Sequence, residues 1–343
     1  MELQEVFGRY LSDIDTELRA SLRDGGSLAP FYGMMRYHLG WVNERFQPAS
    51  ADVGKRLRPT LALLCADATG GDYRVALPAA AAIELVHNFS LIHDDIEDRS
   101  NERRHRPTVW RLWGEPHAIN AGDGLLMVAR LALHRLVDQG VAAERVLALS
   151  RSFDETCLAL CQGQFLDMSY EERTDVTVEM YLEMTGGKTA ALISYAAYAG
   201  ALLGSDDPRT ADGYRRFGRE LGLAFQIVDD VLGIWGAPTV TGKPAAEDIV
   251  SKKKSLPVVY AFEKARGQRR KALEEVYDKP SLDAADVQRV LELLHEVGAR
   301  SYAQRMAEVY RDHALAELPP VEEGNTAQEG LRVLARYLVE RVY

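Results

Sequence analysis

Cysteine is scarce in this sequence. Cys65, Cys157 and Cys161 are the three cysteines among 343 residues. Three cysteines do not form a disulfide framework, and zinc sites need a second close pair, which Cys157 and Cys161 do not have nearby. We therefore interpret the thiols as core residues of a protein from a reducing compartment, and we expect a cytoplasmic location.

The sequence also lacks an excess of positive charge. Lys and Arg number 41 against 51 Asp and Glu, so the net charge is −10. This balance argues against a general nucleic-acid binder, and any anion site must be built from local basic clusters. The N-terminal stretch "MELQEVFGRYLSDIDTELRASL" has no apolar core of the signal-peptide type, and no apolar run approaches the length of a membrane span. We expect neither a nucleic-acid partner nor a membrane span.

Proline is absent between Pro116 and Pro208. This stretch is rich in Ala, Leu, Glu and Met, and apolar residues recur at three- and four-residue spacings, as in "LLMVARLALHRLV". Breaks such as "DGGSLAP" and "DKPSLDAAD" are typical of turns between helices, and Ser281 or Asp283 could cap the helix that follows. No linker or repeat divides the chain. The sequence predicts one all-α domain over residues 1–343, a large bundle of roughly ten or more helices.

Two apolar helices end in paired acids. In "LIHDDIEDRS", Asp94 and Asp98 lie on one stripe of a predicted helix. Two carboxylates one turn apart repel each other unless a cation lies between them, and hard oxygen ligands suit Mg²⁺. A solvated acidic helix end is the alternative. The second helix, "LGLAFQIVDDVLGIWG", repeats the pattern with Asp229 and Asp230. The repetition favours metal ions that bind a diphosphate.

Basic clusters accompany the acids. They occur in "GKRLRP", "ERRHRP", "TGGKT" and "GKPAAEDIVSKKKS". Arginine matches phosphate oxygens in pairs, and lysine supplies a point charge, although a solvated face could explain any one cluster alone. "GGKT" is not part of a P-loop, because Leu182 stands where the first glycine would be and no strand precedes it.

In this order, the motifs resemble the trans-polyprenyl diphosphate synthase family, most like its bacterial geranylgeranyl diphosphate synthases, from Gly54 to Pro257. The resemblance implies the all-helical isoprenoid synthase fold around a central cavity, and a homodimer. It also implies a prenyltransferase that condenses isopentenyl diphosphate with an allylic diphosphate, using about three Mg²⁺ ions per active site.

The resemblance also assigns residues. Metal ligands are Asp94, Asp98 and Asp229, with Asp230 supporting. The allylic substrate is expected to contact Arg103, Lys188, Thr189, Gln226, Lys243 and Lys253. Isopentenyl diphosphate is expected to contact Gly54, Lys55, Arg58, His87 and Arg104. The residues expected to act directly in catalysis are Asp94, Asp98, Asp229, Lys188 and Arg103.

Product length is expected to depend on Phe89 and Ser90, which stand five and four residues before the first aspartate. One aromatic followed by a small residue resembles the C20 arrangement, with C15 farnesyl diphosphate or a longer chain as the alternatives. Gly233 departs from the family pattern, because it stands where a third aspartate is usual. We expect Gly233→Asp to have a mild effect, since the native chain works without that carboxylate.

Two other functions remain open. A class I terpene cyclase also ionises diphosphates with Mg²⁺, but it would not need the second diphosphate pocket that "GKRLRP" and His87 suggest. A non-catalytic subunit of a heteromeric synthase would be expected to have lost an aspartate motif or its basic partners, and both are present here.

Overall fold

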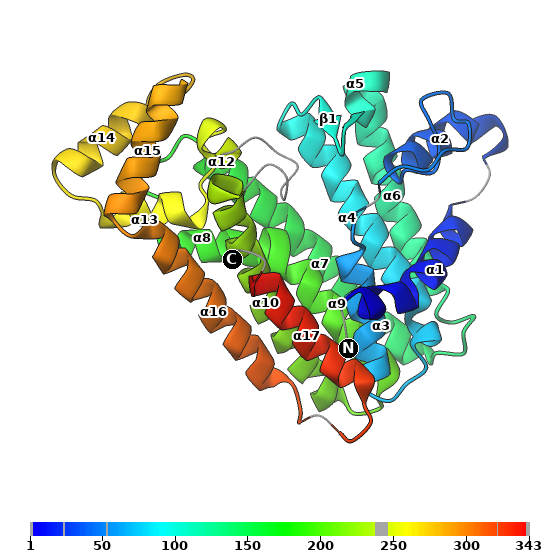
Figure 1. Ribbon diagram of the computed structural model, residues 1–343. Coiled ribbons are helices and arrows are strands. Elements are labelled where there is room, and N and C mark those ends of the chain that lie inside the picture. The colour runs from blue at the N-terminus through cyan, green and yellow to red at the C-terminus, as the bar shows by residue number, and fades with distance from the viewer. Residues whose placement is uncertain (1–2, 23–24, 53, 237–245, 321, 341–343) are drawn as a thin grey trace. The chain divides into compact units, whose positions relative to one another are not determined.

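The computed structural model describes residues 3–22, 25–52, 54–236, 246–320 and 322–340 (Figure 1). These residues are almost entirely helical. They contain one short hairpin, in which β1 (Glu102–Arg103) pairs antiparallel with β2 (Arg106–Pro107). The prediction of an all-α fold with ten or more helices is confirmed.

The backbone clusters into two compact units. Unit 1 comprises Met1–Asp154, Ala196–Asp212 and Val321–Leu331, and unit 2 comprises Glu155–Tyr195, Gly213–Pro320 and Arg332–Tyr343. The expectation of a single domain over residues 1–343 stays a prediction.

Unit 1 is built around α4 (Leu77–Glu97), which packs along α6 (Glu115–His134). Alanines Ala79 to Ala82 are buried on α4 and allow close helix packing. The other helices that lie wholly in this unit are α1 (Leu3–Ser21), α2 (Ala29–His38), α3 (Leu57–Ala68) and α5 (Val109–Trp113). Proline stands in the first turn of α2, α4 and α6, where its missing N–H costs no helical hydrogen bond.

One segment corrects an expectation drawn from the sequence. Tyr73–Glu97 is long and apolar enough to cross a membrane by length and composition, although no such run was expected. However, 72% of its most apolar 18-residue window is buried within the protein. This burial is the pattern of a core helix.

The central helices confirm the prediction from the proline-free stretch. It contains α7 (Ala143–Tyr170), α8 (Val178–Thr185) and α9 (Ala191–Gly204), and α10 (Pro208–Trp235) begins at the next proline. Between α8 and α9, Gly186–Ala190 forms a π-helical turn. Such turns are rare and often lie at functional sites.

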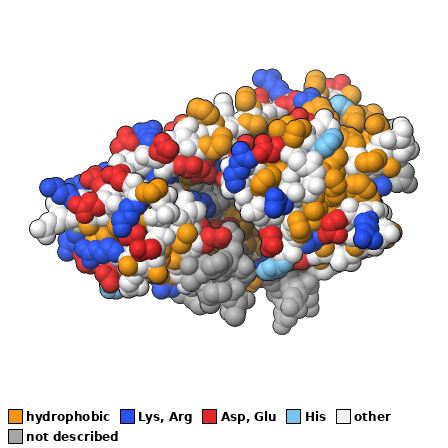
Figure 2. All heavy atoms as spheres, turned by 90° about the horizontal axis from the view of Figure 1, so that it is seen from above, with side chains coloured by type: hydrophobic (Ala, Val, Ile, Leu, Met, Phe, Trp, Pro, Cys, Tyr) orange, Lys and Arg blue, Asp and Glu red, His pale blue; other side chains and the backbone are white. Residues whose placement is uncertain are grey.

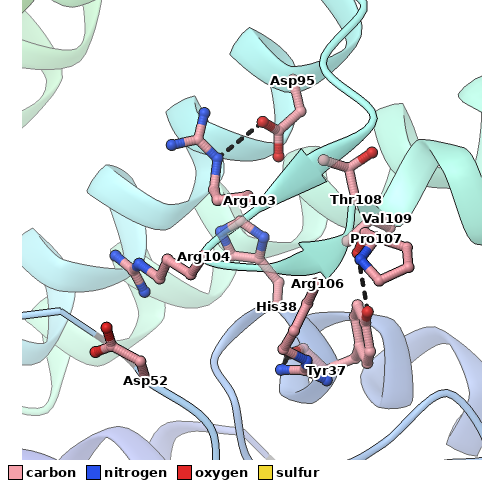
Figure 3. Close-up of a pocket in the computed structure, with 10 residues that line it drawn as sticks. All are labelled: Tyr37, His38, Asp52, Asp95, Arg103, Arg104, Arg106, Pro107, Thr108 and Val109. Carbon is pink, nitrogen blue, oxygen red and sulfur yellow. Dashed lines mark hydrogen bonds and ion pairs between the residues drawn. The ribbon is translucent and has the colours of Figure 1, made fainter. Parts of the chain in front are cut away.

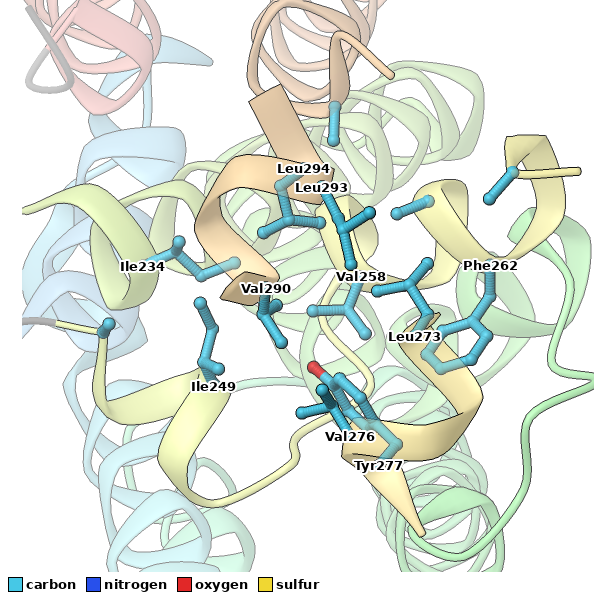
Figure 4. Packing of buried hydrophobic residues seen from close by; sticks show 14 residues of the cluster. Ile234, Ile249, Val258, Phe262, Leu273, Val276, Tyr277, Val290, Leu293 and Leu294 are labelled. Atoms are coloured by element: carbon cyan, nitrogen blue, oxygen red, sulfur yellow. The ribbon is translucent and has the colours of Figure 1, made fainter. Parts of the chain in front are cut away.

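Unit 2 has a hydrophobic cluster formed by α10 and the helices that follow it. Figure 4 shows Ile234 of α10, Ile249 of α12 (Glu247–Val250) and Val258 of α13 (Leu256–Lys264) pointing into this cluster. It also includes side chains of α14 (Gln268–Tyr277) and α15 (Ala284–Glu296). Asp283 caps α15 in a capping box, so of the two predicted caps it is the one used. The last two helices that the structure describes are α16 (Ala299–Glu317) and α17 (Thr326–Glu340), and α17 begins in unit 1 and ends in unit 2.

Acidic and basic side chains are interspersed over the face that Figure 2 draws, with hydrophobic side chains between them. That face therefore carries mixed charge rather than a broad field of one sign.

Candidate active site

The first aspartate motif lies at the end of α4. The N–H of Asp98, the C-cap residue, donates to the carbonyl oxygen of Asp94 at 2.8 Å. The backbone thus places these two residues one turn apart, as the sequence predicted. Asp94 is half-buried and Asp98 is exposed, so both can be reached by a solvated cation.

Asp95, between them, points into the protein. Its Oδ1 accepts a hydrogen bond from Arg103 Nε at 2.8 Å, and its side chain is 1% exposed. Its Oδ2 is buried and has no hydrogen-bond partner among the described residues. Burial raises the pKa of Asp95 to about 6, although Arg103 opposes the rise. Asp95 therefore anchors Arg103, a role that sequence reasoning did not assign.

A pocket rich in cations opens beside this pair (Figure 3). It is lined by Tyr37, His38, Asp52, Asp95, Arg103, Arg104, Arg106, Pro107, Thr108 and Val109. Arg104 adopts a left-handed backbone conformation, with φ of 52°. Its Nη2 lies 3.0 Å from the point where a Cβ on Gly54 would stand, and Gly54 has φ of 75°. Glycine therefore allows the guanidinium to lie against the backbone, and two residues predicted to share a site lie together.

Arg58 and His87 lie in the same cluster of charges. Arg58 Nη1 is 3.3 Å from His87 Nε2. Burial lowers the pKa of His87 well below its ordinary value, and Arg58 and Arg104 lower it further. Predicted Lys55 is exposed and lies between Gly54 and α3. The predicted isopentenyl diphosphate residues thus lie near one another within unit 1.

Two arginines of the basic motifs, Arg56 and Arg106, stabilise the fold. Arg56, with φ of 53°, is buried and pairs with Glu84 at 2.9 Å, which anchors the "GKRLRP" loop to α4. Arg106 donates to the carbonyl oxygens of Tyr37 at 3.0 Å and Val42 at 2.9 Å, which ties the hairpin to the loop after α2. Each of these guanidiniums already has protein partners.

His38 is a pocket residue that sequence reasoning missed. It ends α2, and in Figure 3 its ring lies among Arg103, Arg104 and Arg106. Burial, followed by the charges of the three arginines, lowers its pKa to about 3. His38 is therefore neutral at physiological pH. No spacing in the sequence predicts this role for His38. The residue meets the arginines only because the end of α2 lies beside the hairpin segment, which is distant in the sequence.

The second aspartate pair has a different environment. Asp230 is 0% exposed and accepts hydrogen bonds from Tyr181 Oη at 2.6 Å and the Leu256 N–H at 2.9 Å. It also accepts one from Gln226 Nε2 at 2.9 Å and lies 3.6 Å from Lys253 Nζ. Asp230 thus connects α8, α10 and the start of α13, while its neighbour Asp229 is half-buried.

The predicted allylic residues of unit 2 that the structure describes bond to one another or to nearby acids. Thr189 Oγ1 donates to Gln226 Oε1 at 2.8 Å, and Gln226 in turn donates to Asp230. Lys188 Nζ donates to Asp167 Oδ2 at 2.5 Å. Asp167 was not predicted, because a lone acid on an amphipathic helix gives no signal in one sequence. Predicted Lys243 lies outside the described residues.

Lys253 lies among carboxylates. Burial alone would lower the pKa of its ammonium group. Instead the pKa is raised, because Asp230, Asp248, Asp167 and Asp229 together outweigh the effect of burial. This part of unit 2 therefore holds more acid than base, the opposite of the pocket in unit 1.

Phe89 and Ser90 lie on α4. Phe89 is 7% exposed and packs edge to face on His93, with ring centroids 4.8 Å apart. Ser90 Oγ donates to the carbonyl oxygen of His87 at 2.8 Å. Their role in product length stays a prediction.

The described residues contain no group of three or more His, Cys, Asp or Glu side chains arranged to hold a metal ion. Mg²⁺ does not need such a group, because it commonly takes one or two carboxylates and completes its shell with water and substrate phosphates. Reachable carboxylates such as those of Asp94, Asp98 and Asp229 fit that requirement.

Comparison with known proteins agrees with this geometry. The polyprenyl synthetase family profile matches residues 40–294. The chain belongs to the polyprenyl synthetase family. The prediction that it is a prenyltransferase of this kind is confirmed.

Its relatives include synthases of two product lengths. Geranylgeranyl diphosphate synthase of Mycobacterium tuberculosis is 44% identical over 291 residues, which cover 84% of this chain and 82% of the relative. (2E,6E)-farnesyl diphosphate synthase of Mycobacterium bovis is 39% identical over 311 residues, with 90% and 85% covered.

Solved structures show the same fold. Polyprenyl synthetase from Streptomyces coelicolor matches with a TM-score of 0.90 and 36% identity, covering 98% of this chain and 99% of that one. A geranylgeranyl pyrophosphate synthase from Corynebacterium glutamicum, solved with isoprenyl diphosphate and magnesium, matches with a TM-score of 0.82 and 26% identity, covering 99% and 100%. The predicted isoprenoid synthase fold is confirmed.

Proposed function

We propose that this polyprenyl synthetase condenses isopentenyl diphosphate with an allylic diphosphate to give an all-trans C20 product, geranylgeranyl diphosphate. The observation that carries the proposal is the pocket of unit 1. Arginines surround His38 in this pocket and act on His87 nearby, and both imidazoles are held neutral. Such a pocket has an excess of positive charge and is suited to an anion with several oxygens.

The residues divide the work between two substrates. Arg58, Arg104 and the backbone at Gly54 hold the diphosphate of isopentenyl diphosphate, with His87 beside them. This contact orients the double bond for attack, and orientation of this kind lowers the barrier substantially.

The second set of residues serves the leaving group. Arg103, Lys188 and Lys253 balance the charge that develops on the allylic diphosphate as its C–O bond breaks. Asp94, Asp98 and Asp229 would hold Mg²⁺, about three ions per site, which supply further positive charge to that diphosphate when bound. The double bond then attacks the allylic cation, and the departing diphosphate takes up the released proton.

Product length is the finer part of the proposal. Phe89 followed by Ser90 favours C20, whereas the relatives include both C20 and C15 synthases. Removing the Phe89 ring should deepen the cavity, and an aromatic ring at residue 90 should make it shallower. We expect a longer product from Phe89→Ala and a C15 product from Ser90→Phe.

The test is product analysis by chromatography. The purified protein is incubated with isopentenyl diphosphate, Mg²⁺ and a C5, C10 or C15 allylic primer in turn. The proposal predicts geranylgeranyl diphosphate. A cyclic hydrocarbon would favour the cyclase, and absence of turnover with every primer would favour the non-catalytic subunit. Unchanged lengths in both variants would show that other residues limit the chain.

A second copy of the chain is the proposed partner. Along α6, Ile119, Met127 and Leu131 are exposed at helical spacing, and Leu131 is 65% exposed. Leu147 on α7 is also exposed. Exposed apolar side chains at helical spacing favour a homodimer, which we place in the cytoplasm. Light scattering should show a dimer for the native chain and a monomer for Leu131→Glu.

A further inference from the structure

Gly233 has no side chain, yet the space beside it is filled. The carboxylate of Asp248 lies where a side chain on Gly233 would begin. A Cβ built there would be 2.3 Å from Asp248 Oδ2 and 2.5 Å from its Cγ. Real Cβ atoms do not approach other atoms so closely, so any larger residue at position 233 must displace Asp248.

The packing of unit 2 brings these residues together. Ile234 follows Gly233, and Ile249 follows Asp248. Both isoleucines point into the same hydrophobic cluster (Figure 4). The short helix α12 is thus packed against the end of α10, which delivers the Asp248 side chain to the Gly233 backbone. Asp248 is 8% exposed, so its side chain is enclosed by this packing.

The Asp248 carboxylate lies on the side of α10 that carries Asp229. Asp229 and Gly233 are four residues apart on one helix, so they share a face. Lys253 is near both acids, since its Nζ lies 3.8 Å from Asp248 Oδ2 and both carboxylates act on its ammonium group. Asp248 therefore belongs to the same charged cluster as Asp229.

We infer that Asp248 supplies, from α12, the carboxylate that Gly233 lacks, so that Asp229 and Asp248 together form the metal-binding face of the second aspartate site. The inference rests on the proposed metal-dependent function. It also revises the expectation that Gly233→Asp is mild, because the new side chain would compete with Asp248 for one space.

The test is a direct titration of the full chain with Mn²⁺ alone, followed by electron paramagnetic resonance. Asp248→Asn keeps the shape of the side chain and removes its charge. We expect it to weaken Mn²⁺ binding at one class of sites roughly 10- to 100-fold, as Asp229→Asn should. Gly233→Ala should weaken the same class, because its methyl group displaces Asp248.

Two double variants provide the matched comparison. Gly233→Asp with Asp248→Gly returns a carboxylate to the same space from α10 and should restore binding to within about threefold of the native chain. Gly233→Ala with Asp248→Gly relieves the same clash without a carboxylate and should stay weak.

Specific outcomes overturn the inference. If Asp229→Asn loses a class of Mn²⁺ sites while Asp248→Asn keeps it, Asp248 is not a ligand, although the metal dependence stands. If the two double variants bind Mn²⁺ equally, a carboxylate in this space does not contribute to Mn²⁺ binding. If the native chain binds no Mn²⁺, the metal-dependent function fails, and this inference fails with it.

Discussion

The pocket of unit 1 and the acidic cluster of unit 2 shift the pKa of basic side chains in opposite directions. Burial and the surrounding arginines lower the pKa of His38 in the pocket and of His87 nearby, so both rings stay neutral. In the cluster, four carboxylates overcome burial and raise the pKa of Lys253. One region has cations in excess and the other has carboxylates in excess.

This difference in charge indicates which kind of ligand suits each region. Unbalanced charge in a partly buried place is costly unless a ligand of the opposite sign completes it. The pocket is therefore suited to a diphosphate by itself. The cluster is suited to metal ions, through which a second diphosphate would be held.

The largest expected effect tests the metal-binding side. Asp229→Ala and Asp94→Ala each remove a reachable carboxylate, and we expect kcat to fall at least about 10²- to 10³-fold, or roughly 3–4 kcal/mol. Steady-state kinetics at saturating Mg²⁺ measures this. Near-native turnover in either variant would remove that residue from the metal site.

The buried aspartates Asp230 and Asp95 should contribute differently to the stability of the fold. Both oxygens of Asp230 accept hydrogen bonds, so an amide group would face a donor, and we expect Asp230→Asn to cost about 2–4 kcal/mol of unfolding free energy. Asp95 has one bonded oxygen and a buried Oδ2 without a partner among the described residues, so Asp95→Asn should cost less than about 1 kcal/mol.

Urea denaturation of the metal-free protein measures both changes. If Asp230→Asn and Asp95→Asn lose equal unfolding free energy, the difference in their hydrogen bonds does not affect stability.

The next effect separates the two substrates. Arg104→Ala should raise KM for isopentenyl diphosphate about ten- to a hundredfold, because a charge-assisted contact to phosphate is worth about 1.5–3 kcal/mol. Lys188→Ala should act mainly on the allylic substrate. Initial rates with each substrate varied in turn provide the answer, and two variants that harm the same substrate alone would contradict the assignment.

The effect of His38 is the smallest of these near neutral pH, and it grows as the solution is acidified. His38 has a pKa of about 3 in the folded protein and an ordinary value of 6.5 when unfolded. The unfolded chain therefore binds the extra proton first, so His38 reduces stability as pH falls from 6.5 towards 3. Compared with His38→Gln, the native chain should lose up to about 1.4 kcal/mol per pH unit in this window. The measurement is the urea midpoint of the native chain and of His38→Gln as a function of pH. If the two midpoints change with pH in the same way, His38 does not titrate as described.

Local patterns in the sequence predicted much of this molecule. The stretch without proline became helices α7 to α9, and Asp94 and Asp98 are one turn apart because helical spacing fixes that relation. The residues that were missed depend on packing between distant segments. Asp248 reaches Gly233 through the contact of α12 with α10, and Asp167 meets Lys188 from another helix. The spacing of residues within one segment does not predict contacts of this kind.

The most direct test of the central claim is isothermal titration calorimetry of ligand binding with and without Mg²⁺. If the pocket of unit 1 is complete by itself, isopentenyl diphosphate should bind in EDTA, and Arg104→Ala should weaken that binding about ten- to a hundredfold. A non-reactive allylic diphosphate analogue should bind tightly only when Mg²⁺ is present. Isopentenyl diphosphate that binds only with Mg²⁺, or an allylic analogue that binds equally well in EDTA, would contradict the account.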